Sequence, residues 1–438
     1  MSNNPFKTLW MPVLLATAAW PLAASGPTLS VLYNGTFPAS GGTGLLEGAP
    51  GLFYLSSAYY TVYSVDLHGT VTILASFKNP PFNIDSNPGV LAADGLLYSS
   101  VDQVTSANVF SVGSTPGSEK IYAKQSVTPE LAGSLPDGDL FALALSTTAP
   151  SALATVDLRG VVTSLYQFAT TDRPDPPTYG ADGNYYGVSG QAISGATSYF
   201  YRVTPSGTFT NIAPLPFVSG GLWYGDGVLL QGTDGNFYGI QQTGLGCSSS
   251  NQHGAVYKLT LSGQFTILHD FGVCGKAIIN SLIEGSDGKL YGIIQDTNEI
   301  FSVTKSGTYK PVAALNGTYG ICTCGLMQGS DGNIYGSAFS GGSTGYGTVF
   351  ALNAGLPVPK PSAREFYPAS GPVGTQVRIW GYNLFGASAK FNGVAATNVR
   401  NAGPNYVWAT VPTGATSGPI TVTTPGGTSI TKQSFTVQ

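Results

Sequence analysis

Residues 231–239 read Gln231-Gly-Thr-Asp-Gly-Asn-Phe-Tyr-Gly239, and their core, Asp-Gly followed within three residues by an aromatic, recurs along the chain. An Asp-Gly pair supplies the positive-φ positions of a tight hairpin turn, and the aromatic residues after it favour a strand. Further copies are Asp94-Gly-Leu-Leu-Tyr98, Asp137-Gly-Asp-Leu-Phe141, Asp182-Gly-Asn-Tyr-Tyr186, Asp287-Gly-Lys-Leu-Tyr291 and Asp331-Gly-Asn-Ile-Tyr335. A degenerate copy, Pro50-Gly-Leu-Phe-Tyr54, brings the number of repeats to seven.

The spacing of the repeats predicts the architecture. Successive aromatic positions lie 43 to 53 residues apart, which suits propeller blades of four short strands. In the sixth repeat we expect strands at 281–285, 289–294, 299–304 and 308–315, with a second turn at Ser306-Gly307. The seventh repeat runs into proline-rich sequence without a fourth strand, and Thr28–Tyr33 resembles the missing one. We therefore predict an all-β fold: a seven-bladed β-propeller closed by an N-terminal strand, which removes unpaired sheet edges.

Composition supports an ordered β protein. Of 438 residues only 9% are charged, 42% are hydrophobic and 59 are glycine. The polar positions are filled by Ser, Thr, Gly and Asn rather than by strong helix formers, which argues against a helical bundle. The hydrophobic content is high enough to fill a core, which argues against disorder.

The first 24 residues are typical of a cleaved secretory signal. Lys7 precedes a mostly apolar stretch, and Leu22-Ala23-Ala24 offers small residues near a cleavage point. No other segment is long and apolar enough to span a bilayer. Export permits disulfides, and we expect them among the four cysteines, Cys247, Cys274, Cys322 and Cys324, with the pairing open. Free thiols and a zinc site are the alternatives, and the spacing of these cysteines suits zinc poorly.

The repeats also resemble a known family. The run 231–239, followed by Gly254-Ala-Val-Tyr-Lys-Leu-Thr-Leu-Ser-Gly263 and Phe265-Thr-Ile-Leu-His-Asp-Phe271, is similar to the GloVer tandem repeat of exported bacterial proteins. Ser330-Asp-Gly-Asn-Ile-Tyr-Gly336 with Gly347-Thr-Val-Phe350 is similarly close, whereas the second and third repeats diverge. The resemblance implies a propeller that is secreted or held at the cell surface, and it implies no catalytic residues.

The tail is predicted to be a second domain. We assign residues 28–355 to the propeller, 356–362 to a linker stiffened by Pro357, Pro359 and Pro361, and 363–438 to a β-sandwich of short strands. Five segments resemble the immunoglobulin-like IPT/TIG domain in family order: 366–375, 379–383, 390–394, 409–412 and 417–428. Trp380 stands where that family often has a small polar residue. The resemblance implies a spacer or adhesion module.

Charge is unevenly distributed between the two parts. The segment after residue 355 carries six lysines and arginines and only one acidic residue, Glu365, although the whole chain has a net charge of -4. An acidic body joined to a basic tail favours docking of one on the other. The basic residues are scattered rather than clustered, so we expect no nucleic-acid partner.

Strand direction places the Asp-Gly and Ser-Gly turns on one face of the propeller, the turn face, and the remaining loops on the other, the loop face. The longest insertions and all four cysteines belong to the loop face, where binding residues of rigid scaffolds usually lie. The candidate ligand-binding residues are Asp172, Arg173, Trp223, Asp226, His253, Tyr319 and Tyr346. We interpret the repeated aromatics as core, the repeated aspartates as turn formers, and His68 and His269 as ordinary surface residues.

No catalytic or metal-binding motif emerges. Gly341-Gly-Ser-Thr-Gly345 matches G-x-S-x-G but lacks a strand-to-helix elbow, and no calcium loop, HExxH or nucleotide fingerprint is present. We expect no cofactor and no metal. The hypothesis is a secreted or cell-surface, non-enzymatic binding or scaffold protein that recognises extracellular glycan or protein through the loop face. The alternatives are a carbohydrate-active hydrolase or lyase using His253 and Arg173, and a purely structural spacer.

Overall fold

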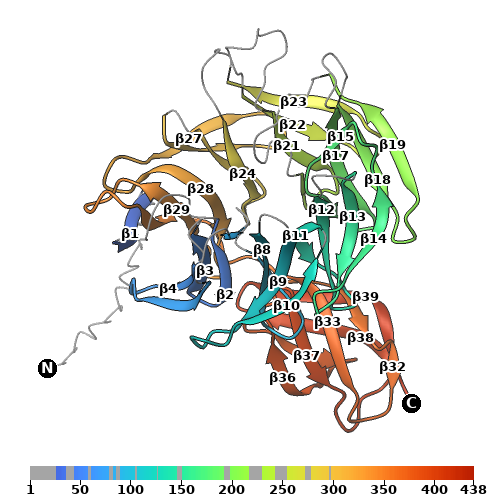
Figure 1. The fold of residues 1–438 in the computed structure, drawn as a ribbon. Helices are drawn as coiled ribbons and strands as arrows, with labels where there is room; N and C mark the ends of the chain where they lie inside the picture. Colours follow the sequence, from blue (N-terminus) through green and yellow to red (C-terminus); the bar gives the residue numbers. More distant parts are fainter. Residues whose placement is uncertain are drawn as a thin grey trace, which may run out of the picture.

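The computed structural model describes residues 26–35, 44–57, 61–77, 82–84, 89–103, 106–125, 127–145, 150–191, 198–216, 229–241, 254–271, 278–294 and 297–438. Within these ranges the chain forms seven antiparallel sheets around a common centre, followed by a two-sheet unit at the C-terminus (Figure 1). The prediction of an all-β seven-bladed propeller is confirmed. None of the described residues forms a helix long and apolar enough to cross a membrane.

The first four blades follow in chain order. Blade 1 is β2 (Leu46–Ala49), β3 (Leu52–Ser57), β4 (Thr61–Asp66) and β5 (Val71–Ser76). Blade 2 is β6 (Phe82–Ile84), β7 (Val90–Leu91), β8 (Leu97–Gln103), β9 (Ser106–Val112) and β10 (Lys120–Gln125), with β6 and β7 both pairing with β8. Blade 3 is β11 (Thr128–Ser134), β12 (Leu140–Leu145), β13 (Ala152–Val156) and β14 (Val162–Gln167). Blade 4 is β15 (Asp172–Pro174), β16 (Thr178–Tyr179), β17 (Tyr185–Gln191), β18 (Tyr199–Val203) and β19 (Phe209–Pro214).

The remaining blades close the ring. Blade 5 is β20 (Leu230–Gln231), β21 (Phe237–Gln241), β22 (Ala255–Leu259) and β23 (Phe265–Asp270). Blade 6 is β24 (Ile278–Glu284), β25 (Leu290–Ile294), β26 (Glu299–Val303) and β27 (Tyr309–Ala314), close to the strands expected for the sixth repeat. Blade 7 is β28 (Ile321–Gln328), β29 (Ile334–Ser340), β30 (Thr348–Asn353) and, as its fourth strand, β1 (Thr28–Asn34). Because β1 pairs with β30 over its whole length, the predicted closure by the N-terminal strand is confirmed.

The core of the propeller lies between the blades. The described residues form seven hydrophobic clusters that each join two neighbouring blades, including the junction of blade 7 with blade 1. The repeated tyrosines belong to these clusters, as Tyr186 and Tyr238 illustrate, both 2% exposed or less. The interpretation of the repeated aromatics as core is therefore correct. A single blade has two apolar faces, and only stacking buries both of them.

The C-terminal unit consists of two sheets. One has the order β31 (Ser362–Tyr367), β33 (Gln376–Tyr382), β37 (Tyr406–Thr410), β36 (Thr397–Asn401). The other has the order β32 (Ser370–Gly371), β39 (Gly427–Val437), β38 (Gly418–Thr424), β34 (Ser388–Phe391), β35 (Val394–Ala395). Residues of both sheets share one hydrophobic cluster, which contains Ile379, Val407, Val422 and Phe435. The opposite side of the first sheet faces the propeller, near blades 2 and 3 in Figure 1.

Candidate functional site

The repeated aspartates hold their own hairpins. Asp234 accepts hydrogen bonds from the Asn236 side chain at 2.8 Å and from the Tyr238 hydroxyl at 2.7 Å. The same tyrosine-to-aspartate bond recurs in four other blades, as Tyr98–Asp94, Tyr186–Asp182, Tyr291–Asp287 and Tyr335–Asp331. The interpretation as turn formers is correct, and each carboxylate also anchors the buried tyrosine four residues later.

The glycine after the repeated tyrosine makes room for a ring of the neighbouring strand. Gly239 on β21 lies directly opposite Tyr257 on β22, and a Cβ built on Gly239 would lie 2.3 Å from the Tyr257 hydroxyl oxygen. Gly336 and Phe350 of blade 7 form an equivalent pair, with 2.3 Å to the ring. The Tyr-Gly step of the repeat is thus a packing requirement.

Polar side chains at the ends of four inner strands, Glu47, Gln231, Glu284 and Gln328, tie their blades to the preceding blades, and we call these residues the blade clasps. Glu284 accepts hydrogen bonds from the backbone N–H of Thr233 at 2.8 Å and from its hydroxyl at 2.6 Å. Glu47 does the same with Ser330 of blade 7, at 2.8 Å for both bonds. Two glutamines use the amide oxygen for this purpose, Gln231 toward Ala181 and Gln328 toward Ser286.

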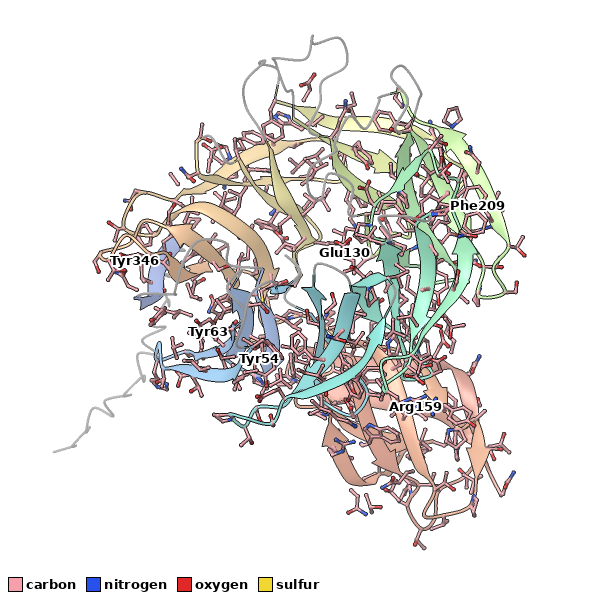
Figure 2. All side chains as sticks on the ribbon, in the orientation of Figure 1. Tyr54, Tyr63, Glu130, Arg159, Phe209 and Tyr346 are labelled. Atoms are coloured by element: carbon pink, nitrogen blue, oxygen red, sulfur yellow. The ribbon has the colours of Figure 1, made fainter. Side chains whose placement is uncertain are left out.

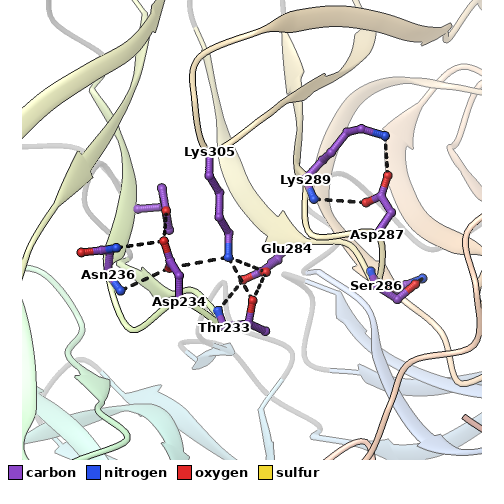
Figure 3. A network of polar contacts seen from close by, with 10 residues as sticks. Thr233, Asp234, Asn236, Glu284, Ser286, Asp287, Lys289 and Lys305 are labelled. Atoms are coloured by element: carbon purple, nitrogen blue, oxygen red, sulfur yellow. Dashed lines mark hydrogen bonds and ion pairs between the residues drawn. The ribbon is translucent and has the colours of Figure 1, made fainter. Parts of the chain in front are cut away.

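One clasp carries a cation (Figure 3). The Lys305 ammonium lies 2.7 Å from the Glu284 carboxylate and 3.5 Å from that of Asp234, and it donates to the Thr233 hydroxyl at 3.0 Å. It also lies over the Tyr238 ring, 5.6 Å from the centroid. All of these groups lie around the Lys305 ammonium on the turn face between blades 5 and 6. The network fixes a blade junction, so we assign it a structural role.

Asp234 gives this network a pH dependence. Burial alone would raise the pKa of Asp234, but the hydrogen bonds from Asn236 and Tyr238 and the nearby Lys305 outweigh it and lower the pKa to about 2. A depressed pKa stabilises the fold above the unfolded-state value, and this stabilisation is lost as the pH falls through the folded-state value.

We therefore expect Asp234→Asn to lower the thermal midpoint at pH 7 and to have progressively less effect as the pH falls from about 4 toward 2. Thermal unfolding of both proteins across this range checks the prediction. The exposed Glu119→Gln is the control, and it should change the midpoint little at any pH. A constant difference between Asp234→Asn and the wild type across the range would contradict the assignment.

On the loop face, Asp172 is enclosed. Its side chain is 8% exposed and accepts hydrogen bonds from the Tyr199 hydroxyl at 2.8 Å and from the Ala169 N–H at 3.2 Å. These contacts brace the entry into blade 4. We therefore leave Asp172 out of the binding surface proposed below.

Tyr319 and Tyr346 lie in two loops of blade 7 that are bonded to each other. The Gly342 N–H donates to the Gly317 carbonyl at 2.6 Å, and the Thr348 hydroxyl donates to the Tyr319 carbonyl. The Asn34 side chain, at the end of β1, accepts from the Ser343 N–H at 2.9 Å. Tyr319 is half-buried against the cluster between blades 6 and 7, whereas Tyr346 is 55% exposed. We name residues 316–320 and 341–347 the blade 7 rim (Figure 2).

The remaining predicted site residues lie wholly or in their side chains outside the part of the chain that the structure describes. Trp223, Asp226, His253, Cys247 and Cys274 lie outside the described residues. Arg173, Cys322 and Cys324 belong to β15 and β28, and their side chains lie outside the described set. Ser343 of the G-x-S-x-G match sits in an irregular loop, as expected. The described ranges hold no group of three or more His, Cys, Asp or Glu side chains arranged to bind a metal ion.

His269 differs from its interpretation as an ordinary surface residue. Its ring stacks on Tyr309 of blade 6, with the ring centroids 4.5 Å apart and 7° between the ring planes. It also meets the Phe271 ring edge-on, with centroids 4.6 Å apart, and is half-buried. Burial lowers its pKa, although nearby Asp270 opposes the shift. The Tyr309 hydroxyl in turn donates to the Glu299 carboxylate. The contact joins two fourth strands across a blade junction, which the order of residues along one repeat does not reveal.

Comparison with known proteins agrees with the fold. The chain is a β-propeller, and its residues 173–356, from blade 4 into blade 7 and just beyond, match the Gloeobacter/Verrucomicrobia repeat. It is similar to the structure of a streptogramin B lyase, at 15% identity over 75% of this chain and 98% of the other, with a TM-score of 0.54. The chain is also similar to a virginiamycin B lyase from Staphylococcus aureus, at 14% identity over 75% of this chain and 99% of the other, with a TM-score of 0.52. No curated protein matches the chain. At these identities the likeness shows the propeller fold alone.

Proposed function

We propose that this chain is an exported, non-enzymatic recognition protein that binds extracellular glycan or protein through the loop face of its propeller. The titratable groups described above on the turn face take part in hairpins and clasps. The C-terminal unit contacts that same face at blades 2 to 4. The loop face is therefore the side we propose for a ligand.

The observation that carries the proposal is the exposed ring of Tyr346 on the hydrogen-bonded blade 7 rim. An exposed aromatic ring on a braced loop offers a flat apolar contact at low cost in conformational entropy. The surrounding residues of the rim are Asn, Thr, Ser and Gly, without any charge. Their hydroxyl and amide groups both donate and accept hydrogen bonds, as sugar hydroxyls do. This chemistry suits a neutral glycan.

Tyr346→Ala is expected to weaken glycan binding about tenfold or more, because an exposed aromatic at the centre of a contact carries much of its energy. The measurement is binding of the full mature chain to a glycan array, followed by titration of the best ligand. Tyr367→Ala is the matched control, since Tyr367 is 68% exposed on the C-terminal unit, and we expect it to bind like the wild type.

The same array separates this function from its alternatives. An equal loss of binding in both variants would contradict the assignment to the blade 7 rim. New reducing ends or unsaturated sugars among the array products would show a hydrolase or lyase instead. Absence of any retained glycan or extracellular protein would favour the spacer.

We further propose that residues 363–438 form an immunoglobulin-like domain of the IPT/TIG type, joined to the propeller of residues 28–355 by the linker 356–362. The two sheets with one shared core support this assignment. The order of the five matching segments supports it as well.

A further inference from the structure

The clasps are unevenly distributed around the ring. In the described residues, polar clasps occupy the inner-strand ends of blades 5, 6, 7 and 1. The equivalent positions, four residues before the turn glycine, are Leu91 in blade 2, Ser134 in blade 3 and Tyr179 in blade 4. Leucine has no polar group to accept the bond, and the serine and tyrosine side chains are engaged elsewhere. The three exceptions are consecutive blades, and the C-terminal unit contacts all three.

The partner half of the clasp changes as well. Elsewhere, the residue before the turn aspartate donates its N–H to the next blade, as Thr233 and Ser330 do. At the junction of blades 3 and 4 this residue is Pro136, which has no N–H to donate. Its carbonyl instead accepts a hydrogen bond from Arg378 Nε at 3.2 Å. In blade 2 the carbonyl of Ala93 accepts from Trp408 Nε1 at 2.9 Å. Both donors belong to the C-terminal unit.

The replaced side chains make direct contacts with the same unit. The Ser134 hydroxyl accepts from Asn405 Nδ2 at 3.2 Å. Tyr179 packs edge-on against Trp380, with ring centroids 5.7 Å apart. Gly403 of the C-terminal unit lies against Leu91, because a Cβ built on Gly403 would lie 3.2 Å from the Leu91 side chain. Every position that lost its clasp therefore has a partner in the C-terminal unit.

The contact is buried and includes a basic side chain of the C-terminal unit near an acidic residue of blade 3. Trp380 is 2% exposed and Tyr406 is fully buried, and the Tyr406 hydroxyl donates to the Leu135 carbonyl at 2.6 Å. Arg378 lies near the turn of blade 3 and counteracts the burial that raises the pKa of Asp139. Large aromatic residues buried in a contact are typical of the energetic centre of a protein interface.

We propose that blades 2 to 4 are a dedicated docking surface for the C-terminal unit, built by replacing the blade clasps with Leu91, Ser134 and Tyr179, and that the two parts stay associated without a covalent link. The unit thereby supplies hydrogen bonds and packing at the turn ends of blades that lack clasps. The protein then presents its loop face from one rigid body.

The test cuts the folded chain between its two parts. A protease recognition sequence is inserted after Gly355, which is exposed and has open space around it. After cleavage, we expect both fragments to co-elute in size-exclusion chromatography at micromolar concentration. Separate elution of the two fragments at that concentration would overturn the proposal.

Variants test whether the replaced positions carry the association. Trp380→Ala and Tyr179→Gln are each expected to raise the dissociation constant of the cut protein about tenfold or more. Gln231→Leu is the matched control, because it breaks a clasp away from the C-terminal unit, and it should leave the dissociation constant unchanged. Tyr406→Phe, which removes only a hydroxyl, replaces Trp380→Ala if that variant does not fold. Equal weakening by Gln231→Leu and Tyr179→Gln would contradict the assignment.

Discussion

Replacing Gly239 by alanine is expected to lower the free energy of unfolding by about 2 kcal/mol. The new Cβ would lie 2.3 Å from the Tyr257 hydroxyl oxygen and 2.4 Å from its Cζ, far inside van der Waals contact. Tyr257 is 1% exposed and packs in the cluster between blades 4 and 5, so its ring has little room to retreat. Chemical denaturation of the full chain measures the loss.

A double-mutant cycle isolates this contact. Blade 3 has alanine at both equivalent positions, Ala142 opposite Ala154, so a small residue on each strand is compatible with the fold. The double variant Gly239→Ala/Tyr257→Ala should therefore lose less free energy of unfolding than the sum of the losses in the two single variants. Gly317→Ala is the control, because open space surrounds that position. A loss as large as that of Gly239→Ala in the control would contradict the packing argument.

Glu47→Ala is expected to lower the free energy of unfolding by about 3 kcal/mol. Glu47 is 4% exposed and accepts three hydrogen bonds, from the Gly51 N–H and from the N–H and hydroxyl of Ser330. Alanine leaves these donors without their acceptor at the junction where blade 7 meets blade 1. Because this junction also closes the ring, we expect blades 1 and 7 to separate locally more often in the variant. Faster backbone hydrogen exchange in these two blades would show this.

Glu47→Gln is the matched variant and should remain within about 1 kcal/mol of the wild type at pH 7. Gln231 and Gln328 fill the same role in other blades, accepting with the amide oxygen and donating to the carbonyl of their own turn glycine. A loss in the glutamine variant equal to that of Glu47→Ala would show that the charge, rather than the hydrogen-bond acceptor, holds the junction.

The pH dependence of Glu47 has the opposite sign from that of Asp234. Burial raises the pKa of Glu47 above 4.5, although the hydrogen bonds from Gly51 and Ser330 oppose the shift. A raised folded-state pKa means that stability is lost as the pH rises through that value. The wild type should therefore lose stability relative to Glu47→Gln as the pH rises from 4.5 through the raised value.

The loop face shows where prediction from sequence was limited. Tyr346 is exposed and Asp172 is buried, although both were candidates for the same reason, their position in an insertion. Burial depends on tertiary contacts, and Tyr199, the partner of Asp172, lies 27 residues away on another strand of blade 4. Position within a repeat indicates the face of the propeller on which a residue lies, but it does not indicate whether its side chain reaches solvent.

The sequence by itself determined the ring. Asp-Gly turns, strand periodicity and the unmatched fourth strand are local features that recur in each repeat, so seven blades and the closing role of Thr28–Asn34 could be predicted from them. The tertiary structure alone decided how the C-terminal unit sits on that ring. Its hydrogen bonds join residues far apart in the chain, Arg378 to Pro136 and Trp408 to Ala93, separated by 242 and 315 positions. In the sequence, the changes at Leu91, Ser134 and Tyr179 look like ordinary divergence between repeats. Only the folded structure shows that these residues contact the C-terminal unit.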